Sequence, residues 1–254
     1  MSDISTYLFE RGETSVTDLA RILGASLATV RRDLNVLEHQ GLIERSHGAA
    51  RLAARAKTEV GHKSREEQNL VAKRSIAMTA YALLRPGNTI LLDAGTTVLQ
   101  LARQIKLAPL PLTIVTNGLA VAQELADVPI VNLCLLGGRL RTGHLSVVGP
   151  LAETMLLNLW LDFAFLGTSA LSDDLWLTSY DADEAQLNAL MASRAERLVL
   201  LADQSKMSRQ ATYGVRHLLC EDTLITDKAP PDGLVASAVQ TGIKILVAKE
   251  QDHA

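Results

Sequence analysis

The chain has 254 residues, a formal net charge of −3 and 48% apolar residues. This length accommodates one large domain, or a large and a small one, and the apolar fraction excludes wholesale disorder. Two cysteines, Cys134 and Cys220, are too few for a disulfide framework, and their apolar neighbours in the sequence predict buried thiols in a reducing cytosol. No apolar run is long enough to span a membrane, and the polar first residues do not form a signal peptide. These features predict a soluble, cytoplasmic protein.

Two short amphipathic segments separated by a glycine lie near the N-terminus. Residues 15–18 precede apolar residues with helical spacing, and Gly24 follows where that helix would end. Ser26 is a suitable N-cap for a second helix over 27–38. The apolar residues of this second helix share one face and are Leu27, Val30, Leu34 and Leu37. Two helices around a tight turn predict a helix-turn-helix, whose second helix can enter the major groove of DNA.

A basic segment continues beyond the second helix. Between residues 27 and 57 there are six basic and three acidic side chains, a local charge of +3 in an acidic chain. Residues 41–52 read as a small β-hairpin, the wing of a winged helix-turn-helix domain over 1–57. Because DNA phosphates attract such a segment, we predict DNA contacts from this domain. The candidate residues are Ser26, Thr29, Arg31, Arg32, Asn35, Arg45 and His47. For His47, a phosphate contact and a surface position without a role both stay open.

After a polar linker over 55–65, apolar runs alternate with helical segments. The predicted strands cover 89–92, 113–115, 131–136, 163–166, 198–202, 223–226 and 244–247. The predicted helices cover 66–84, 98–105, 119–125, 151–159, 184–197 and 233–241. Short apolar strands that alternate with helices predict an α/β fold, with a Rossmann-like parallel sheet covered on both faces over 58–254. The glycine-rich stretch 137–149 is the expected mobile loop.

Small, hydroxyl-bearing or amide residues follow five of the seven predicted strands. In open parallel sheets, ligands bind beyond the carboxyl ends of the strands, and glycines and hydroxyls at helix starts suit an anion. Each loop by itself is better explained as a turn or a helix cap than as part of a ligand site. Together they predict a site for a small anionic ligand, most simply a phosphate ester. The candidate residues are Asp93, Gly95, Thr96, Thr97, Asn117, Gly138, Arg139 and Lys206.

Several other chemistries lack their motifs. No lysine follows a GxxxxG pattern and no GxGxxG follows the first strand, which argues against nucleotide hydrolysis and a dinucleotide cofactor. The histidines show no ligand spacing, and we predict neither a metal site nor a cofactor. The acidic residues Asp181, Asp183 and Glu184 fit the first turn of a helix better than an acid–base or metal cluster.

Both halves of the chain resemble the DeoR family of bacterial transcription regulators. In the first half the resemblance rests on the TVRRDL motif at 29–34 and on RSHG at 45–48. In the second half it rests on segments that occur in the family's order, namely DAGTT at 93–97, Thr116-Asn117, Gly137-Gly138, Gly149, 162–167, Asp203-x-Ser205-Lys206 and 225–227. The family implies a winged helix-turn-helix that binds operator DNA, usually as a repressor. It also implies a sensor domain, similar to sugar-phosphate isomerases and CoA transferases, that binds a phosphorylated sugar or a catabolic intermediate.

The resemblance also assigns residues. It implies that Thr29, Arg31, Arg32 and Asn35 face DNA and that Asp93, Gly95, Thr96, Thr97, Asn117, Gly138 and Lys206 face the effector. Two positions depart from the family pattern. Ala49 stands where family members usually have a second glycine after the wing's His47-Gly48, and Asn188 stands where many have a lysine four residues after Glu184. We expect the first to affect wing geometry and the second to affect the choice of effector. A symmetric operator further implies a homo-oligomer, a dimer or a tetramer.

Two functions other than that of a regulator are compatible with parts of the sequence. An isomerase or transferase with an accessory DNA-binding domain needs a general base and a lysine electrophile, for which Asp93, Glu184 and Lys206 are candidates. Because asparagine and not lysine stands at position 188, this set of catalytic candidates is incomplete. A pure oligomerisation module does not require polar residues at strand ends. The sequence therefore favours a ligand-controlled DNA-binding regulator.

Overall fold

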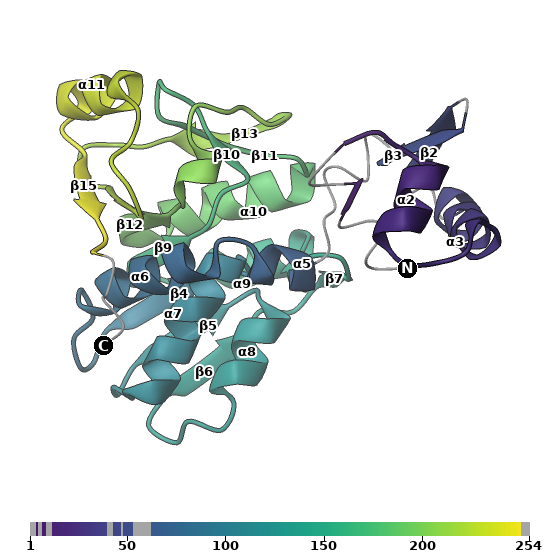
Figure 1. The fold of residues 1–254 in the computed structure, drawn as a ribbon. Helices are drawn as coiled ribbons and strands as arrows, with labels where there is room; N and C mark the ends of the chain where they lie inside the picture. Colours follow the sequence, from purple (N-terminus) through teal and green to yellow (C-terminus); the bar gives the residue numbers. More distant parts are fainter. Residues whose placement is uncertain are drawn as a thin grey trace. The chain divides into compact units, whose positions relative to one another are not determined.

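A computed structural model describes residues 4, 7–8, 12–39, 43–46, 48–52 and 62–249. The chain divides into two compact units, Met1–Arg65 and Glu66–Ala254, which are described separately below (Figure 1). The predicted domain boundary at 57–58 and the predicted DNA-binding residue His47 lie outside the described residues.

The first unit contains a helix-turn-helix and a wing. Helix α2 (Val16–Ile22) begins after Ser15, whose Oγ accepts a hydrogen bond from the Asp18 N–H at 3.0 Å. Helix α3 (Leu27–His39) follows Ser26, whose Oγ accepts one from the Thr29 N–H at 3.1 Å. An antiparallel sheet in the order β1-β3-β2 completes the unit. Its strands are β1 (Thr14–Ser15), β2 (Ile43–Ser46) and β3 (Ala49–Leu52).

The core of the first unit contains most of the predicted apolar face of α3. Val30, Leu34 and Leu37 are buried and belong to a cluster with residues of α2 and the wing. Leu27, which was expected on the same buried face, is 42% exposed. That expectation was wrong because Leu27 is the first residue of the helix and lies outside this cluster.

The second unit is built on a seven-stranded sheet in the order β15-β14-β12-β9-β4-β5-β6, and every neighbouring pair is parallel. The chain winds outward from β4 to β6 and then returns to β9 on the other side of β4. The sheet consists of the seven predicted strands, which confirms the α/β fold class. The strands are β4 (Thr89–Leu92), β5 (Thr113–Thr116), β6 (Asn132–Leu135), β9 (Leu161–Leu166), β12 (Ala195–Leu201), β14 (Thr223–Thr226) and β15 (Lys244–Val247).

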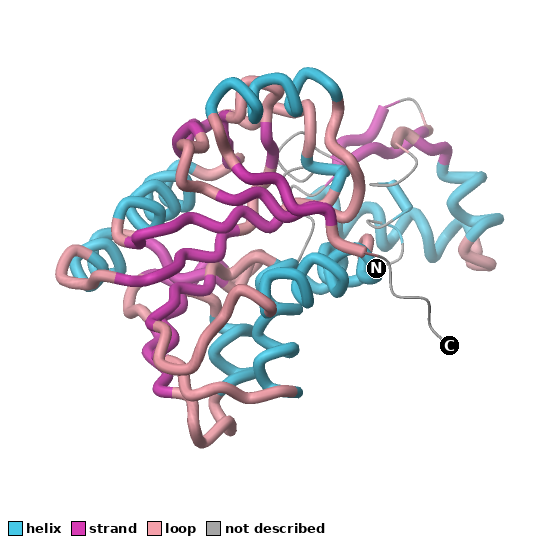
Figure 2. The backbone as a smooth tube through the Cα atoms, turned by 90° about the vertical axis from the view of Figure 1, so that its left-hand side faces the viewer, coloured by secondary structure: helices cyan, strands magenta, loops and turns pink. Residues whose placement is uncertain are grey.

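Helices cover both faces of this sheet, which forms the central layer of the unit in Figure 2. Side chains of β4 alternate between two apolar clusters, because Ile90 and Leu92 pack with α6, α7 and α8 while Leu91 packs with α9, α10 and α11. The helices are α5 (His62–Glu67), α6 (Leu70–Tyr81), α7 (Thr96–Leu107), α8 (Leu119–Leu125), α9 (Pro150–Leu156), α10 (Ala182–Ser193) and α11 (Asp232–Thr241), with a 3-10 turn η1 (Gln204–Lys206).

Two small antiparallel sheets were not predicted. The stretch 137–149, expected to be a mobile loop, contains a hairpin of β7 (Arg139–Arg141) and β8 (Ser146–Val148). Strands β10 (Ala170–Leu171), β11 (Trp176–Ser179) and β13 (Tyr213–His217) form a second antiparallel sheet. These strands are too short and too mixed in polarity to appear as apolar runs.

The two cysteines correct another expectation. Cys134 and Cys220 are both exposed, although their apolar neighbours in the sequence predicted burial. Cys134 lies in β6, the strand at one edge of the seven-stranded sheet, where no other described strand pairs with its outer side. Across the described ranges, no helix has the length and apolar character needed to cross a membrane.

Candidate functional site

Asp93 occupies the point where the winding of the sheet reverses. It follows β4 and is 4% exposed, and its Oδ2 accepts hydrogen bonds from the N–H groups of Gly95 and Gly167, at 3.3 and 3.2 Å. Gly167 follows β9, the strand beside β4 on the other side from β5. A Cβ at Gly95 would lie 3.2 Å from this carboxylate oxygen. The close approach therefore favours glycine, and such reversal points are where open parallel sheets bind ligands.

A second carboxylate, the partly buried Glu184 in α10, lies close enough to Asp93 to affect its ionisation. Burial and the negative charge of Glu184 raise the pKa of Asp93 to about 6, although three backbone hydrogen bonds oppose the shift. Burial also acts to raise the pKa of Glu184. Contacts with His144 and Arg141 and a hydrogen bond from Ser179 outweigh it and lower this pKa to about 2. The two acids therefore titrate far apart.

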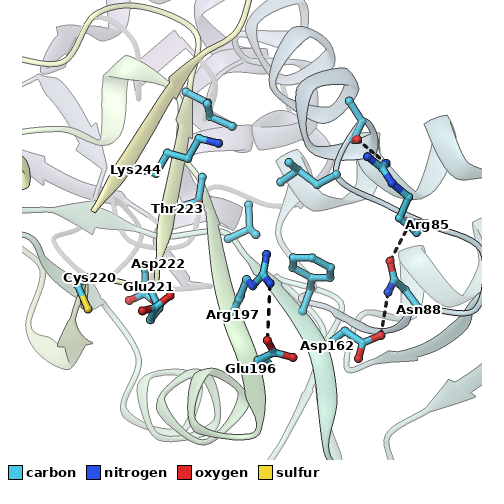
Figure 3. Close-up of a pocket in the computed structure, with 15 residues that line it drawn as sticks. Arg85, Asn88, Asp162, Glu196, Arg197, Cys220, Glu221, Asp222, Thr223 and Lys244 are labelled. Atoms are coloured by element: carbon cyan, nitrogen blue, oxygen red, sulfur yellow. Dashed lines mark hydrogen bonds and ion pairs between the residues drawn. The ribbon is translucent and has the colours of Figure 1, made fainter. Parts of the chain in front are cut away.

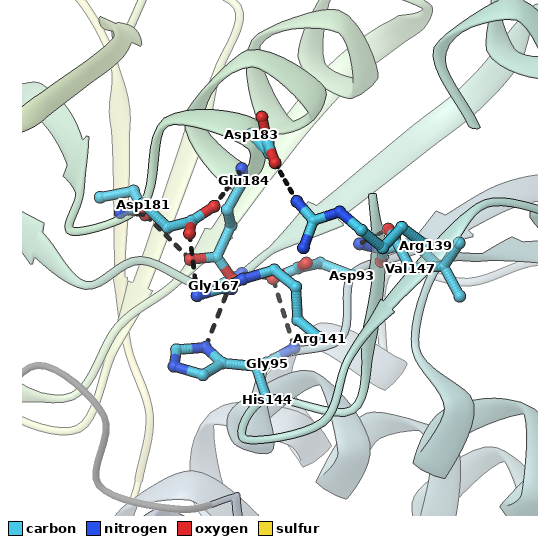
Figure 4. A network of polar contacts seen from close by, with 12 residues as sticks. Asp93, Gly95, Arg139, Arg141, His144, Val147, Gly167, Asp181, Asp183 and Glu184 are labelled. Atoms are coloured by element: carbon cyan, nitrogen blue, oxygen red, sulfur yellow. Dashed lines mark hydrogen bonds and ion pairs between the residues drawn. The ribbon is translucent and has the colours of Figure 1, made fainter. Parts of the chain in front are cut away.

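Glu184 is held in a network with the β7–β8 hairpin (Figure 4). Its carboxylate accepts a hydrogen bond from the Ser179 Oγ at 2.8 Å. The Arg141 Nη1 and the His144 Nδ1 lie 3.5 and 3.6 Å from its Oε1. The Arg141 Nη2 also lies 3.2 Å from the Asp181 Oδ2. Arg141 and His144 are candidate site residues that sequence reasoning missed, because their contacts join segments far apart in the chain. Glu184 was considered only as a helix-start residue or as a general base of the less favoured enzyme.

The acidic residues at the start of α10 serve more than one purpose. Asp181 is the N-cap of α10, with its Oδ1 accepting from the Glu184 N–H at 2.9 Å. This is the helix-start position that the sequence favoured. Asp183 forms an ion pair with Arg139. Arg139, predicted as a cation for the ligand, is therefore engaged by the first turn of α10.

Buried polar atoms without a hydrogen bond gather around these two carboxylates. They come from the ends of β4 and β5, from the β7–β8 hairpin, and from α10 one turn after Glu184. The atoms are Asp93 Oδ1, Asn117 Oδ1, Arg141 Nη1, His144 Nε2, Ser146 Oγ and Asn188 Oδ1. Buried polar groups in folded proteins are almost always paired, so these atoms leave hydrogen-bonding capacity for water or for a polar ligand.

The β7–β8 hairpin is attached to the end of β5. The Asn117 Nδ2 donates to the Val147 carbonyl at 3.4 Å, and Gly118 forms an isolated bridge with Ser146. Gly138, which precedes the hairpin, has φ +146°, and a Cβ there would lie 2.7 Å from the Val148 carbonyl oxygen. Glycine is therefore required at position 138 for the hairpin to close.

The remaining predicted effector residues lie in two places. Thr96 and Thr97 are buried in the first turn of α7, directly after Gly95. Lys206 lies in η1, after β12, and β9 separates β12 from β4. The structure thus brings together the residues that follow β4, β5 and β9, and it places Lys206 two strands away from β4.

A cavity of about 640 Å³ lies at the opposite end of the strands (Figure 3). It is lined by residues that precede or begin the strands, among them Asn88, Asp162 and Lys244. The Asn88 Nδ2 donates to the Asp162 Oδ2 at 2.9 Å, and the Arg197 Nη2 lies 3.7 Å from the Glu196 Oε1. None of the predicted effector residues lines this cavity.

The exposed face of α3 carries the predicted DNA-binding residues. Thr29, Arg31, Arg32 and Asn35 are all exposed. Within the described part of the chain, neither Arg31 nor Arg32 forms an ion pair, so both guanidinium groups are free to meet phosphates or bases. Arg45 of the wing donates a hydrogen bond to the Asn35 Oδ1 and therefore links the wing to α3.

Two family models match the chain, one for each unit. The DeoR-like helix-turn-helix domain matches residues 2–56, and the DeoR C-terminal sensor domain matches residues 68–228. The chain belongs to the DeoR family. The resemblance predicted from the sequence is thereby confirmed, and the chain is a DNA-binding transcriptional regulator rather than an enzyme.

Relatives that match over most of their length support this assignment. The HTH-type transcriptional regulator GlpR of Haloferax volcanii is 41% identical over 84% of this chain and 83% of its own length. The HTH-type transcriptional repressor CsqR of Escherichia coli K12 is 32% identical over 95% of this chain and 92% of its own length. The regulator GolR of Listeria innocua is 31% identical over 95% of both.

Solved structures resemble the chain more distantly. Ribose 5-phosphate isomerase A of Methanocaldococcus jannaschii is 19% identical, with a TM-score of 0.42 over 55% of each chain. The translation initiation factor eIF-2B of Pyrococcus horikoshii is 15% identical, with a TM-score of 0.44 over 83% of this chain and 73% of that one.

Proposed function

We propose that this DeoR-family regulator is a cytoplasmic repressor of a sugar or carbohydrate catabolic operon. It acts as a homodimer or homotetramer, and a phosphorylated sugar or related intermediate releases it from operator DNA. The named relatives support a regulator, and one of them is named a repressor. The observation that carries the effector half of the proposal is the group of buried polar atoms without hydrogen bonds around Asp93 and Glu184.

The chemistry around Asp93 suits a ligand with an anionic end and a hydroxyl-bearing end. Gly95 is the N-cap of α7 and offers no side chain to cap the helix, so the first N–H groups of α7 are directed at the site together with the positive end of the helix dipole. The hydroxyl of Thr97 lies in the same turn. On the hairpin side, Arg141 and His144 present donors, while Asn117 and Asn188 present carbonyl oxygens. Donors and acceptors in this mixture match the hydroxyls of a sugar.

Binding to DNA is tested with substitutions on α3. We expect Arg31→Ala and Arg32→Ala each to weaken binding to the DNA that flanks the protein's own gene, measured by fluorescence anisotropy. A lost arginine–guanine contact costs roughly 1–3 kcal/mol, or roughly 5- to 150-fold in affinity. A lost phosphate contact instead makes the affinity for DNA depend less steeply on salt concentration. Lys106→Ala, which removes one positive charge from the second unit, is the control. Unchanged affinity in both arginine variants would contradict the assignment of α3.

Effector binding is tested by thermal shift with a panel of phosphorylated sugars. A ligand at 100 times its dissociation constant stabilises the folded state by about 2.7 kcal/mol. We expect Thr97→Val to reduce the shift, because it removes a buried hydroxyl from the first turn of α7, close in the sequence to Asp93, at nearly constant volume. Thr79→Val makes the same change on α6 and should leave the shift intact. A ligand that stabilises both variants equally binds elsewhere, and a panel in which no member releases the DNA complex argues against the effector class.

A further inference from the structure

Strand β6 is an edge strand whose outer side is open. Among the residues that the structure describes, it pairs only with β5, and it ends the sheet at the side opposite to β15, as Figure 1 shows. The N–H groups of Asn132 and Leu136 donate to the carbonyls of Leu112 and Thr116, at 2.9 and 2.8 Å. Successive residues of a strand direct their backbone N–H and C=O groups to opposite sides. The backbone groups of Cys134, like those of Asn132 and Leu136, therefore face β5. The N–H and C=O groups of Leu133 and Leu135 therefore point outward.

This edge lacks the features that normally protect one. Residues 128–138 contain no charged side chain, whereas β15 at the other edge begins with Lys244. Edge strands in natural proteins are usually blunted by charges, prolines or bulges within the strand. Here the strand is regular through its register with β5, and Leu135 is 40% exposed. Two further apolar side chains near this edge are exposed. Ile130, just before the strand, is 50% exposed, and Leu151, whose side chain lies beside Gly137, is 59% exposed.

We propose that β6 pairs with β6 of a second copy of this chain, in an antiparallel arrangement about a two-fold axis. A second copy fits this edge because an uncharged strand of alternating outward backbone groups is complementary to itself. The DNA-binding role also requires a symmetric oligomer, since helix-turn-helix proteins read two half-sites with two symmetric subunits. The inference thus rests on the proposed oligomer and adds the surface through which it forms.

In the proposed register, which is centred on Cys134, the outward groups of the two copies face each other. Leu133 of one copy and Leu135 of the other exchange two hydrogen bonds, and this places the two Cys134 residues directly opposite each other. Such a pair without hydrogen bonds has its Cα atoms about 4.5 Å apart, with both side chains on the same face. That separation is within the range of about 4.4–6.8 Å that a disulfide requires. Cys134 is also exposed, so the pair is a built-in reporter of the interface.

The test uses the full chain carrying Cys220→Ser, which leaves Cys134 as the single thiol. Diamide accepts two electrons and two protons as two thiols join in one disulfide. We expect a covalent dimer on a non-reducing gel at micromolar protein. The matched control, Cys134→Ser with Cys220 retained, should stay monomeric on the same gel. Light scattering after gel filtration, without oxidant, gives the mass of the non-covalent species.

Substitution at Leu135 tests the hydrogen bonds directly. Leu135→Pro removes an outward N–H that β5 does not use, and prolines are tolerated on the open side of an edge strand. We expect this variant to elute at half the mass of the wild type or less, and Leu135→Ala to keep the wild-type mass. If Leu135→Pro does not fold, as judged by circular dichroism, Leu135→Lys replaces it. A wild-type monomer would overturn both the interface and the proposed oligomer. A dimer that neither cross-links at Cys134 nor responds to the Leu135 variants would overturn the interface alone.

Discussion

At the level of single residues, the site places two carboxylates with opposite pKa shifts beside each other. Glu184 stays ionised at any physiological pH, because Arg141 and His144 offset its burial. Asp93 has only backbone N–H donors and faces a negative neighbour, so its pKa rises to about 6. One acid is therefore a fixed acceptor of hydrogen bonds, and the other changes its charge near neutral pH. Environments that separate the pKa values of two acids are typical of functional sites.

The raised pKa of Asp93 has a consequence for stability. Between pH 3.8, its ordinary value, and about 6, the folded state holds the proton more tightly than the unfolded state. The free energy of unfolding therefore falls as pH rises through this window, by at most about 3 kcal/mol. Asp93→Asn removes this titration. We expect urea denaturation to show the variant gaining stability over the wild type between pH 5 and pH 7.5. A stability difference that is the same at both pH values would contradict the buried, raised pKa.

At the level of elements, the central sheet was predictable because buried parallel strands are continuous apolar runs. The runs at 89–92 and 223–226 have the same bounds as β4 and β14. Polar residues then mark the carboxyl ends, so the position of Asp93 and Asn117 at one end of the sheet follows from the parallel arrangement. Ser26 likewise caps α3 with the hydrogen bond that its place in the sequence predicts.

Other elements could not be predicted, for reasons that are physical. An edge strand such as β6 has the same apolar pattern as a central one, which is why Cys134 seemed buried. The hairpin strands β7 and β8 have three residues each, and Leu145 between them adopts φ +54°, which no apolar pattern reveals. The contacts of Arg141 and His144 with Glu184 exist only after the hairpin and α10 are folded. This part of the polar network could therefore not be predicted from the sequence.

For the whole molecule, the distribution of apolar residues decides which parts fold as units. One cluster of buried residues belongs to Met1–Arg65, while the two clusters on the faces of the seven-stranded sheet belong entirely to Glu66–Ala254. Every residue of the polar network around Asp93 also comes from the second unit. A domain of this length buries enough apolar surface to be stable by itself.

We therefore expect a fragment that begins at His62, the first residue of α5, to fold without the DNA-binding unit. Its far-UV circular dichroism should show mixed helix and strand, and thermal unfolding should be a single cooperative transition, because both faces of its sheet are closed by its own helices. The ligand that stabilises the full chain should raise the midpoint of the fragment as well, while the fragment should not bind the operator. Thr97→Val, made in the fragment, is the control for the ligand shift. A fragment that folds but no longer responds to the ligand would show that the effector site needs residues before His62.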